Sequence, residues 1–326
     1  MKFTKPPTTF PEQRELLVSR GMIGDPATIE LRLSTTNYYR LSAYWHTFRE
    51  VDRTTNTQGE RLIGCSFDVV WQRYCFDRQL RLLVMDAIER IEVTIRTSLS
   101  YGLAHERRDP FGYVTDVDAL PKIKGRPKER AELLQRIEEE TDRAHEVFKD
   151  KFFVKYGDSH RHLPIWMATE IMTFRTILTL FQAASNNVKQ AVAASFGVHH
   201  SVFSSWLLTL NTVRNVCAHH GRLWNRQFGN SPTIPTGQHC RHWNTPVLIK
   251  HSRMFAVLTM INHCINNIAP EVRWTQRFVD LLSQHQSVPI KYMGFPDNWR
   301  TSPLWTAAGD REEPTLVPTE TQFPAG

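Results

Sequence analysis

The residues best suited to acid–base chemistry on an anionic substrate lie in one segment, 206–222. Its polar positions combine two arginines, two asparagines and a histidine, namely Arg214, Arg222, Asn211, Asn215 and His219. A guanidinium binds phosphate through a planar fork of donors, and an imidazole transfers protons near its own pKa. This set of side chains is therefore typical of phosphate chemistry.

The periodicity of this segment predicts a helix from Val202 to about His220, with Ser201 as its N-cap. At about 100° per residue, the polar side chains fall within roughly 140° of Arg214. The opposite face is apolar, and its members are Trp206, Leu210, Val213, Val216 and Cys217. His220 falls among these apolar residues, which favours His219 as the chemically active histidine. A helix whose polar face is simply hydrated remains the alternative for this pattern.

Composition restricts the class of protein without choosing a function. The chain has 326 residues, 40 Lys and Arg against 33 Asp and Glu, and a net charge of +7. This basic excess is compatible with a nucleic acid partner. The N-terminus lacks a signal peptide pattern and no apolar run is long enough to span a bilayer, so we expect a cytoplasmic protein without membrane contact.

Cysteine and histidine spacing gives no sign of a metal site. The five cysteines are scattered and form no C-x-x-C pair, which argues against a disulfide framework and a zinc ribbon. His239 and His242 have ligand side chains, but no second ligand pair accompanies them. The pairs His199–His200 and His160–His162 are expected in exposed loops. We expect neither a metal nor a cofactor.

The helical periodicity of the chain predicts an all-α fold. We expect an N-terminal helical extension over residues 1–67, a helical domain over 68–300 and a disordered tail over 301–326. A long amphipathic helix is predicted from Asp68 to about Leu103, with Arg81 on its solvated face, and residues 52–64 read as a loop or small hairpin. A second apolar helix is predicted from Pro164 to about Ala184, in which Glu170 is expected to be a buried partner of an arginine.

Several motifs resemble those of one known family. The run Arg214-Asn-Val-Cys-Ala-His219 matches the R-x4-H signature of the HEPN superfamily, and the wider block 214–226 resembles that of the Abi-like (AbiD/AbiF-type) abortive infection family. Further blocks that look like those of this family are residues 37–45, 74–81, 88–97, 163–166 and 293–299. The resemblance covers roughly residues 7–299.

The resemblance implies a HEPN-like helical bundle with additional N-terminal and C-terminal helices, and a metal-independent endoribonuclease active in bacterial phage defence. His219 would be the general acid or base, Arg214 would hold the scissile phosphate, and Asn215 would orient the phosphate or the imidazole. The 2′-hydroxyl of the RNA would be the nucleophile. Substrate-binding roles would fall to Arg222, Asn211 and Arg226, and supporting roles to Glu170 and His220. Two copies facing each other across a two-fold axis would form a tighter cleft, so we expect a homodimer.

A non-catalytic protein that senses or sequesters RNA through the same basic face is the alternative. A lone imidazole beside Arg214 favours the nuclease, because binding alone does not require it. A nucleotidyl transferase would need clustered acidic residues for magnesium, which the sequence lacks. The basic face is compatible with a regulatory RNA, and an antitoxin protein is the other candidate for a regulatory partner.

Overall fold

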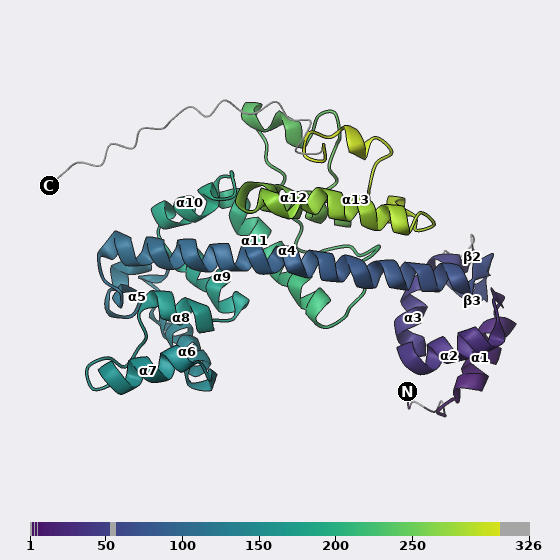
Figure 1. The fold of residues 1–326 in the computed structure, drawn as a ribbon, viewed down its shortest axis with the longest axis horizontal. Helices are drawn as coiled ribbons and strands as arrows, with labels where there is room; N and C mark the ends of the chain where they lie inside the picture. The colour runs from purple at the N-terminus through teal and green to yellow at the C-terminus, as the bar shows by residue number, and fades with distance from the viewer. Residues whose placement is uncertain (1, 3, 5, 53–56, 307–326) are drawn as a thin grey trace.

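The computed structural model describes residues 2, 4, 6–52 and 57–306. Helix α4 (Phe67–Arg107) forms the axis of the molecule, and the other helices pack along its length (Figure 1). Its fully buried residues include Leu80, Ala87, Ile91 and Ile95, which recur at the three- and four-residue steps of one helix face. The prediction of an all-α fold and of this long helix is confirmed.

The N-terminal helices gather around the first turns of α4 (Figure 1). They are α1 (Phe10–Ser19), α2 (Pro26–Thr36) and α3 (Tyr38–Trp45). Thr9 and Glu12 form a capping box at the start of α1, and the carboxylate of Asp25 caps α2. Both helices begin within one residue of the position that their prolines predict.

Four short strands accompany these helices. β2 (Arg49–Asp52) and β3 (Thr57–Leu62) form an antiparallel hairpin, so the small hairpin predicted for residues 52–64 is confirmed, although residues 53–56 lie outside the described part. β1 (Met22–Ile23) pairs in parallel with β4 (Cys65–Ser66). This second pair ties the end of α1 to the start of α4.

A second group of helices packs around the C-terminal half of α4. They are α5 (Gly112–Thr115), α6 (Pro127–Arg143), α7 (Val147–Tyr156), α8 (Ile165–Ile171) and α9 (Phe174–Ala183). The single helix predicted from Pro164 to Ala184 is wrong, because the chain breaks at Met172 and Thr173 caps a new helix. Arg96 of α4 donates to the carbonyls of Thr169 and Met172, which satisfies the end of α8.

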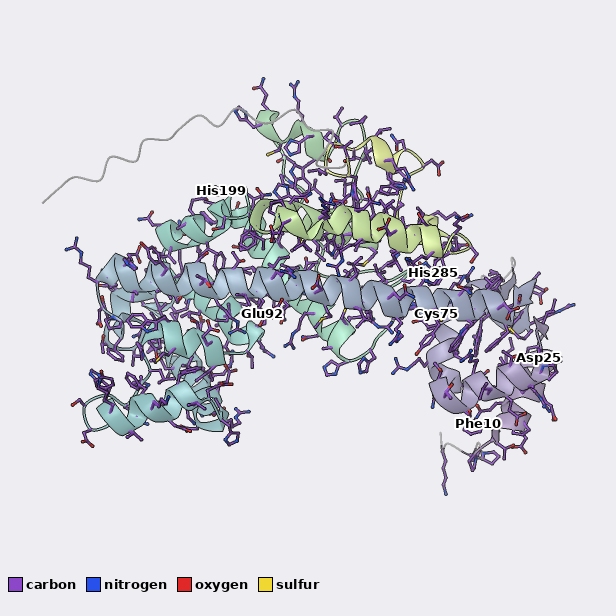
Figure 2. All side chains as sticks on the ribbon, in the orientation of Figure 1. Phe10, Asp25, Cys75, Glu92, His199 and His285 are labelled. Carbon is purple, nitrogen blue, oxygen red and sulfur yellow. The ribbon has the colours of Figure 1, made fainter. Side chains whose placement is uncertain are left out.

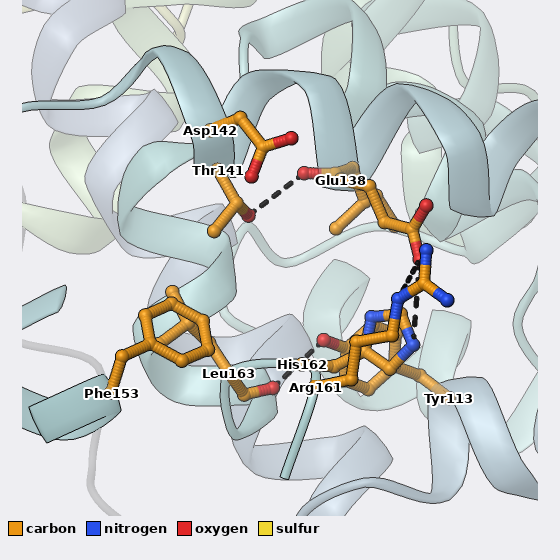
Figure 3. A pocket seen from close by; sticks show the side chains of 9 residues that line it. Tyr113, Glu138, Thr141, Asp142, Phe153, Arg161, His162 and Leu163 are labelled. Atoms are coloured by element: carbon orange, nitrogen blue, oxygen red, sulfur yellow. Dashed lines mark hydrogen bonds and ion pairs between the residues drawn. The ribbon is translucent and has the colours of Figure 1, made fainter. Parts of the chain in front are cut away.

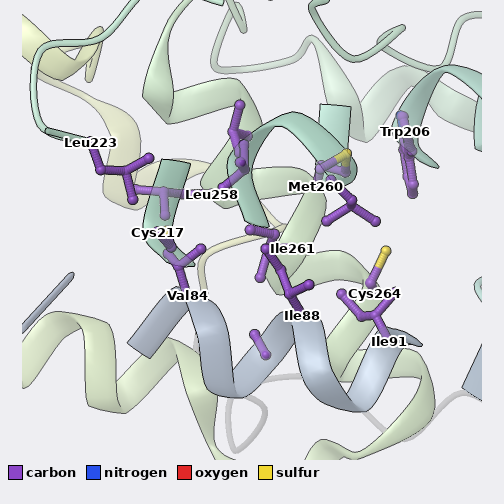
Figure 4. Packing of buried hydrophobic residues seen from close by; sticks show 14 of the residues in the cluster. Val84, Ile88, Ile91, Trp206, Cys217, Leu223, Leu258, Met260, Ile261 and Cys264 are labelled. Carbon is purple, nitrogen blue, oxygen red and sulfur yellow. The ribbon is translucent and has the colours of Figure 1, made fainter. Parts of the chain in front are cut away.

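The remaining helices cover the other side of α4. They are α10 (Asn186–Ala194), α11 (His200–Ala218), α12 (Met254–Ile268) and α13 (Trp274–Gln284). Short 3-10 turns are η1 (His46–Phe48), η2 (Val117–Ala119), η3 (Pro121–Ile123), η4 (Gln238–Trp243), η5 (Pro270–Val272), η6 (Ile290–Met293) and η7 (Trp299–Thr301). Figure 4 shows the shared core, in which Val84 and Ile88 of α4 lie near Cys217 of α11 and Ile261 of α12.

The structure corrects the prediction for the chain's C-terminal end. Residues 301–326 were expected to be disordered, yet Leu304 and Trp305 are buried and the Trp305 Nε1 donates to the Thr259 hydroxyl. Two large apolar side chains after Pro303 are enough to hold this stretch against α12. The rest of the predicted tail, residues 307–326, lies outside the described part. None of the helices in the described ranges is long and apolar enough to cross a bilayer.

Candidate active site

Helix α11 carries the candidate site at its C-terminal end. Its buried residues include Trp206, Leu210, Val213 and Cys217, so the predicted apolar face is confirmed. The helix begins two residues earlier than expected, because the N-cap is His199 rather than Ser201. The His199 imidazole accepts the backbone N–H of Ser201, which satisfies a free donor of the first turn. Cys217 lies on the core side, and burial raises the pKa of its thiol to about 12.

The helix ends at Ala218, so the helical projection does not extend to His220 and Arg222. The N–H of His220 bonds the carbonyl of Cys217, and the N–H of Gly221 bonds that of Val216 at 2.8 Å. This pair of bonds is the Schellman motif, which requires a left-handed residue just after the helix. His220 takes that conformation with φ 55°, where glycine is the usual residue.

His219 and His220 are consequently placed differently from the prediction. His219 is the C-cap residue with φ −88° and ψ 14°, and its side chain is exposed. His220 is exposed as well, so its predicted position among the apolar residues is wrong. The reason is that the chain leaves the helix before His220 and turns it outward.

A buried carboxylate anchors the segment that follows the helix. Asp77 of α4 is 0% exposed, and its Oδ1 accepts the backbone N–H groups of Leu223 and Trp224 at 3.0 and 2.5 Å. Its Oδ2 accepts the Tyr44 hydroxyl at 2.5 Å and the Arg81 guanidinium. The four donors fix the 221–224 segment to α4 and α3.

Arg81 completes this buried network, which corrects the prediction that it faces solvent. It is 6% exposed, pairs with Asp77 one turn away, and its Nη1 lies 3.4 Å from the Gly221 carbonyl oxygen. Burial raises the pKa of Asp77, and Arg81 provides the largest opposing effect. The sequence hint for the pair is the four-residue spacing of Asp77 and Arg81, but helical periodicity assigned Arg81 to the solvated face.

Two arginines connect the same segment to the N-terminal helices. The Arg40 Nη1 of α3 donates to the His220 carbonyl at 2.5 Å, and the Arg222 Nη1 donates to the Ala43 carbonyl at 2.8 Å. Sequence analysis did not single out Arg40, because its partner is 180 positions away. The predicted N-terminal extension therefore forms one wall of the candidate site.

The polar side chains at the end of α11 remain available for a ligand. Arg214 and Asn211 are half-buried, whereas Asn215 and Arg226 are exposed. The Arg226 Nη1 lies 3.3 Å from the Arg222 carbonyl oxygen. Within the ranges that the structure describes, Arg214, Arg222, Arg226 and Arg40 form no ion pair with a carboxylate, so their charge is not neutralised by the protein.

His46 shows that positive charge gathers here. The pKa of its imidazole is lowered by burial, and also by the charges of Arg49 and Arg222. His46 directly follows α3. Arg49 belongs to the hairpin and Arg222 to the segment after α11, so cations from both parts of the chain lie near the His46 imidazole. A cluster of unneutralised cations favours an anionic ligand.

Glu170 does not belong to this site. It is exposed at the end of α8, so the prediction of a buried partner for an arginine is wrong. The nearby arginine, Arg96, pairs with Glu92 of its own helix instead. Because α8 ends at Ile171, Glu170 lies in its last turn rather than in the middle of a long apolar helix.

A separate polar cavity of about 150 Å³ lies between α6 and the loop before α8 (Figure 3). The Glu138 Oε1 lies 3.5 Å from Arg161 Nε and 3.6 Å from His162 Nε2. His160 stacks on Phe111 at 4.4 Å, so the prediction that these loop histidines are simply solvent-exposed is wrong. This cavity contains two carboxylates, from Glu138 and Asp142, and it is therefore less suited to an anion than the end of α11.

His239 and His242 lie in η4, at a distance in the chain from any other ligand pair. In the part of the chain that the structure describes, no three His, Cys, Asp or Glu side chains are grouped closely enough to hold a metal ion.

Comparison with protein families gives a match that covers most of the helices described above. The profile of a family described as Abi-like protein matches residues 32–225, from within α2 to just beyond the segment that Asp77 anchors. Comparisons with curated proteins and with solved structures give no match.

Proposed function

We propose a function from one premise: the chain belongs to the Abi-like protein family, whose role is abortive infection, a bacterial defence against phage. The proposal is that the protein acts in this defence as a metal-independent endoribonuclease, with its active site at the end of α11. The R-x4-H motif and its resemblance to HEPN nucleases support this assignment.

One observation carries the proposal. The fold uses a buried carboxylate, two backbone N–H groups and two arginines to fix the segment after α11, yet His219 at its start is exposed. Arg214, one and a half turns earlier, carries a charge that no described carboxylate neutralises. A rigid frame that leaves a histidine and an arginine free suits catalysis, because reacting groups must be held in position without being occupied.

In the proposed reaction, the RNA 2′-oxygen attacks the adjacent phosphorus while the bond to the 5′-oxygen breaks. The products are a 2′,3′-cyclic phosphate and a 5′-hydroxyl. His219 accepts the proton of the 2′-hydroxyl or donates one to the leaving oxygen. Arg214 stabilises the additional negative charge on the phosphoryl oxygens, and Asn215 orients the phosphate or the imidazole.

A homodimer belongs to this proposal. One imidazole serves as either base or acid at a given moment, whereas the reaction needs both. Two copies related by a two-fold axis at the end of α11 bring two copies of His219 and of Arg214 together. The exposed Asn215 and His219 on the same helix end are compatible with such a contact.

The test is incubation of the full chain with total RNA in EDTA. We expect fragmentation by the wild type, and a loss of about 100-fold or more for the double variant Arg214→Ala, His219→Ala. The matched control is His239→Ala, Arg241→Ala, which removes the same residue types from exposed positions of η4 and should cleave normally. Intact RNA with retarded mobility would instead support the alternative, a non-catalytic RNA-binding protein.

A further inference from the structure

A groove beside Arg40 lies next to the candidate site and has no assigned role. It measures about 330 Å³, and its lining includes Phe10 of α1, Thr36 and Asn37 at the end of α2, Arg40 of α3 and Tyr74 of α4. Arg40 also donates to the carbonyl of His220, the residue after His219. One side chain therefore contacts both the groove and the segment that carries the candidate catalytic histidine.

We propose that this groove binds the nucleobase of a ribonucleotide next to the scissile phosphate. That the cut lies beside the groove rests on the proposed function. The affinity of the groove for RNA does not depend on cleavage and is measured separately. The groove gives the enzyme a base preference, and it draws on the N-terminal helices for that purpose.

The aromatic walls suit a flat base. Phe10 is 44% exposed, so part of its ring is open to a ligand in the groove. Tyr74 is half-buried, and its ring lies edge-to-face on Tyr44 with centroids 5.7 Å apart. Stacking on such rings binds unpaired bases in single-stranded RNA, because every base presents a π face.

Polar groups at the groove offer hydrogen bonds to a base edge. Asn37 accepts the Tyr39 N–H through its Oδ1, and its φ of 58° places it at a sharp bend between α2 and α3. In the described ranges, neither the Asn37 amide nitrogen nor the Thr36 hydroxyl has a hydrogen-bond partner. An amide donates and a hydroxyl donates and accepts, so the pair is able to distinguish bases.

The charge around the groove favours an anionic ligand over a neutral one, and the aromatic walls favour a nucleotide over an acidic peptide segment. No carboxylate lines it, and the unneutralised charges of Arg40, Arg222 and Arg226 lie toward the end of α11. A ribonucleotide places its base among the aromatic walls and its phosphates near these arginines. Figure 2 shows Phe10 among the N-terminal helices, at the end of the molecule where α4 carries Cys75.

The position of Phe10 in the sequence suggests how base preference varies. The Abi-like family match begins at residue 32, so α1 lies outside it, whereas Arg40 and Tyr74 lie inside it. The groove thus combines walls from the matched region with a wall from a segment that the family profile does not cover. A change at Phe10 alters the ligand without altering the candidate catalytic residues.

The experiment uses the full chain with His219→Ala, so that RNA stays intact. A short RNA containing 4-thiouridine is cross-linked by light, and the modified residues are identified by mass spectrometry. We expect cross-links at Phe10 or Tyr74. Adding Phe10→Ala should weaken RNA binding about 5-fold or more, and Phe10→Trp should preserve it.

Tyr101→Ala is the matched control, because Tyr101 is also an exposed aromatic residue, 64% exposed, near the opposite end of α4. Thr36→Val provides a second variant that removes only a hydroxyl, and it should change the preference among bases. Cross-links confined to other parts of the chain, or equal binding by Phe10→Ala and Tyr101→Ala, would overturn the proposal. Cross-links at the groove in a protein whose wild type leaves RNA intact would uphold it while refuting the nuclease.

Discussion

Replacing the buried Asp77 by asparagine should cost far more stability than the loss of an exposed carboxylate from the same helix. The substitution keeps the size of the side chain and one acceptor oxygen, but it removes the charge that faces Arg81. Arg81 is 6% exposed and forms an ion pair with Asp77. Leaving a buried charge without its partner costs about 3–5 kcal/mol.

This cost is large compared with the total stability of a typical domain, about 5–15 kcal/mol. The new amide also places N–H donors opposite the Tyr44 hydroxyl and Arg81, which are donors themselves. The Leu223 N–H also loses its second acceptor, the Oδ2 atom at 3.3 Å, which an amide nitrogen replaces. The segment that follows His219 should therefore loosen before the rest of the fold does.

Asp86→Asn is the control, since Asp86 lies on the same helix, two turns and a half further along. Its side chain is 33% exposed and contacts Arg277 at 2.6 Å and Arg90 at 3.6 Å. Exposed ion pairs contribute about 1 kcal/mol or less, so this variant should unfold close to the wild type.

The assay is urea unfolding followed by circular dichroism, with amide hydrogen exchange of residues 219–226 as a local measurement. We expect a midpoint well below that of Asp86→Asn and faster exchange in this segment. Equal midpoints for the two variants, or unchanged exchange at Leu223 and Trp224, would refute the role given to Asp77.

Three further predictions concern histidines and the dimer. His220→Gly should retain cleavage and stability, because glycine suits φ 55°, whereas His220→Val should lose about 1–2 kcal/mol in urea unfolding; equal stabilities would contradict the left-handed assignment. Mixing equal amounts of wild-type and His219→Ala protein should leave about a quarter of the wild-type cleavage, because only dimers with two copies of His219 hold both an acid and a base, and retention of about half would refute a shared site. Burial lowers the pKa of His285 in the folded chain, so the unfolded chain binds a proton first as the pH falls. The contribution of His285 to the free energy of unfolding should be complete above about pH 6.5 and should decrease below it. His285→Gln should flatten that decline between pH 7 and 5, and an unchanged slope would contradict it.

Local pattern was sufficient to predict the helices and the core side of α11. Its apolar residues recur with helical spacing, so Cys217 and Val213 are buried as their positions predict. Proline likewise occupies the first turn of both α1 and α2, the helical position that it favours. In each case, the information needed lies within a few residues of the feature it determines.

The features that sequence reasoning missed depend on distant contacts. The carboxylate of Asp77 lies 146 positions from the Leu223 N–H that it accepts, and no periodicity reports such a pair. The end of α11 was missed because a histidine, not glycine, occupies the left-handed position. Glu170 was misjudged because the break at Met172 changed which part of the helix it occupies.

In the proposed mechanism, His219 and Arg214 cleave RNA through its own 2′-hydroxyl. The most direct measurement is mass spectrometry of the ends that the wild-type chain produces from a defined RNA in EDTA, beside the same RNA with one 2′-deoxynucleotide at the cut. We predict 2′,3′-cyclic phosphate and 5′-hydroxyl ends, and no cleavage at the deoxy position. Cleavage that continues at the deoxy position, or wild-type protein that leaves the RNA whole, would contradict the account.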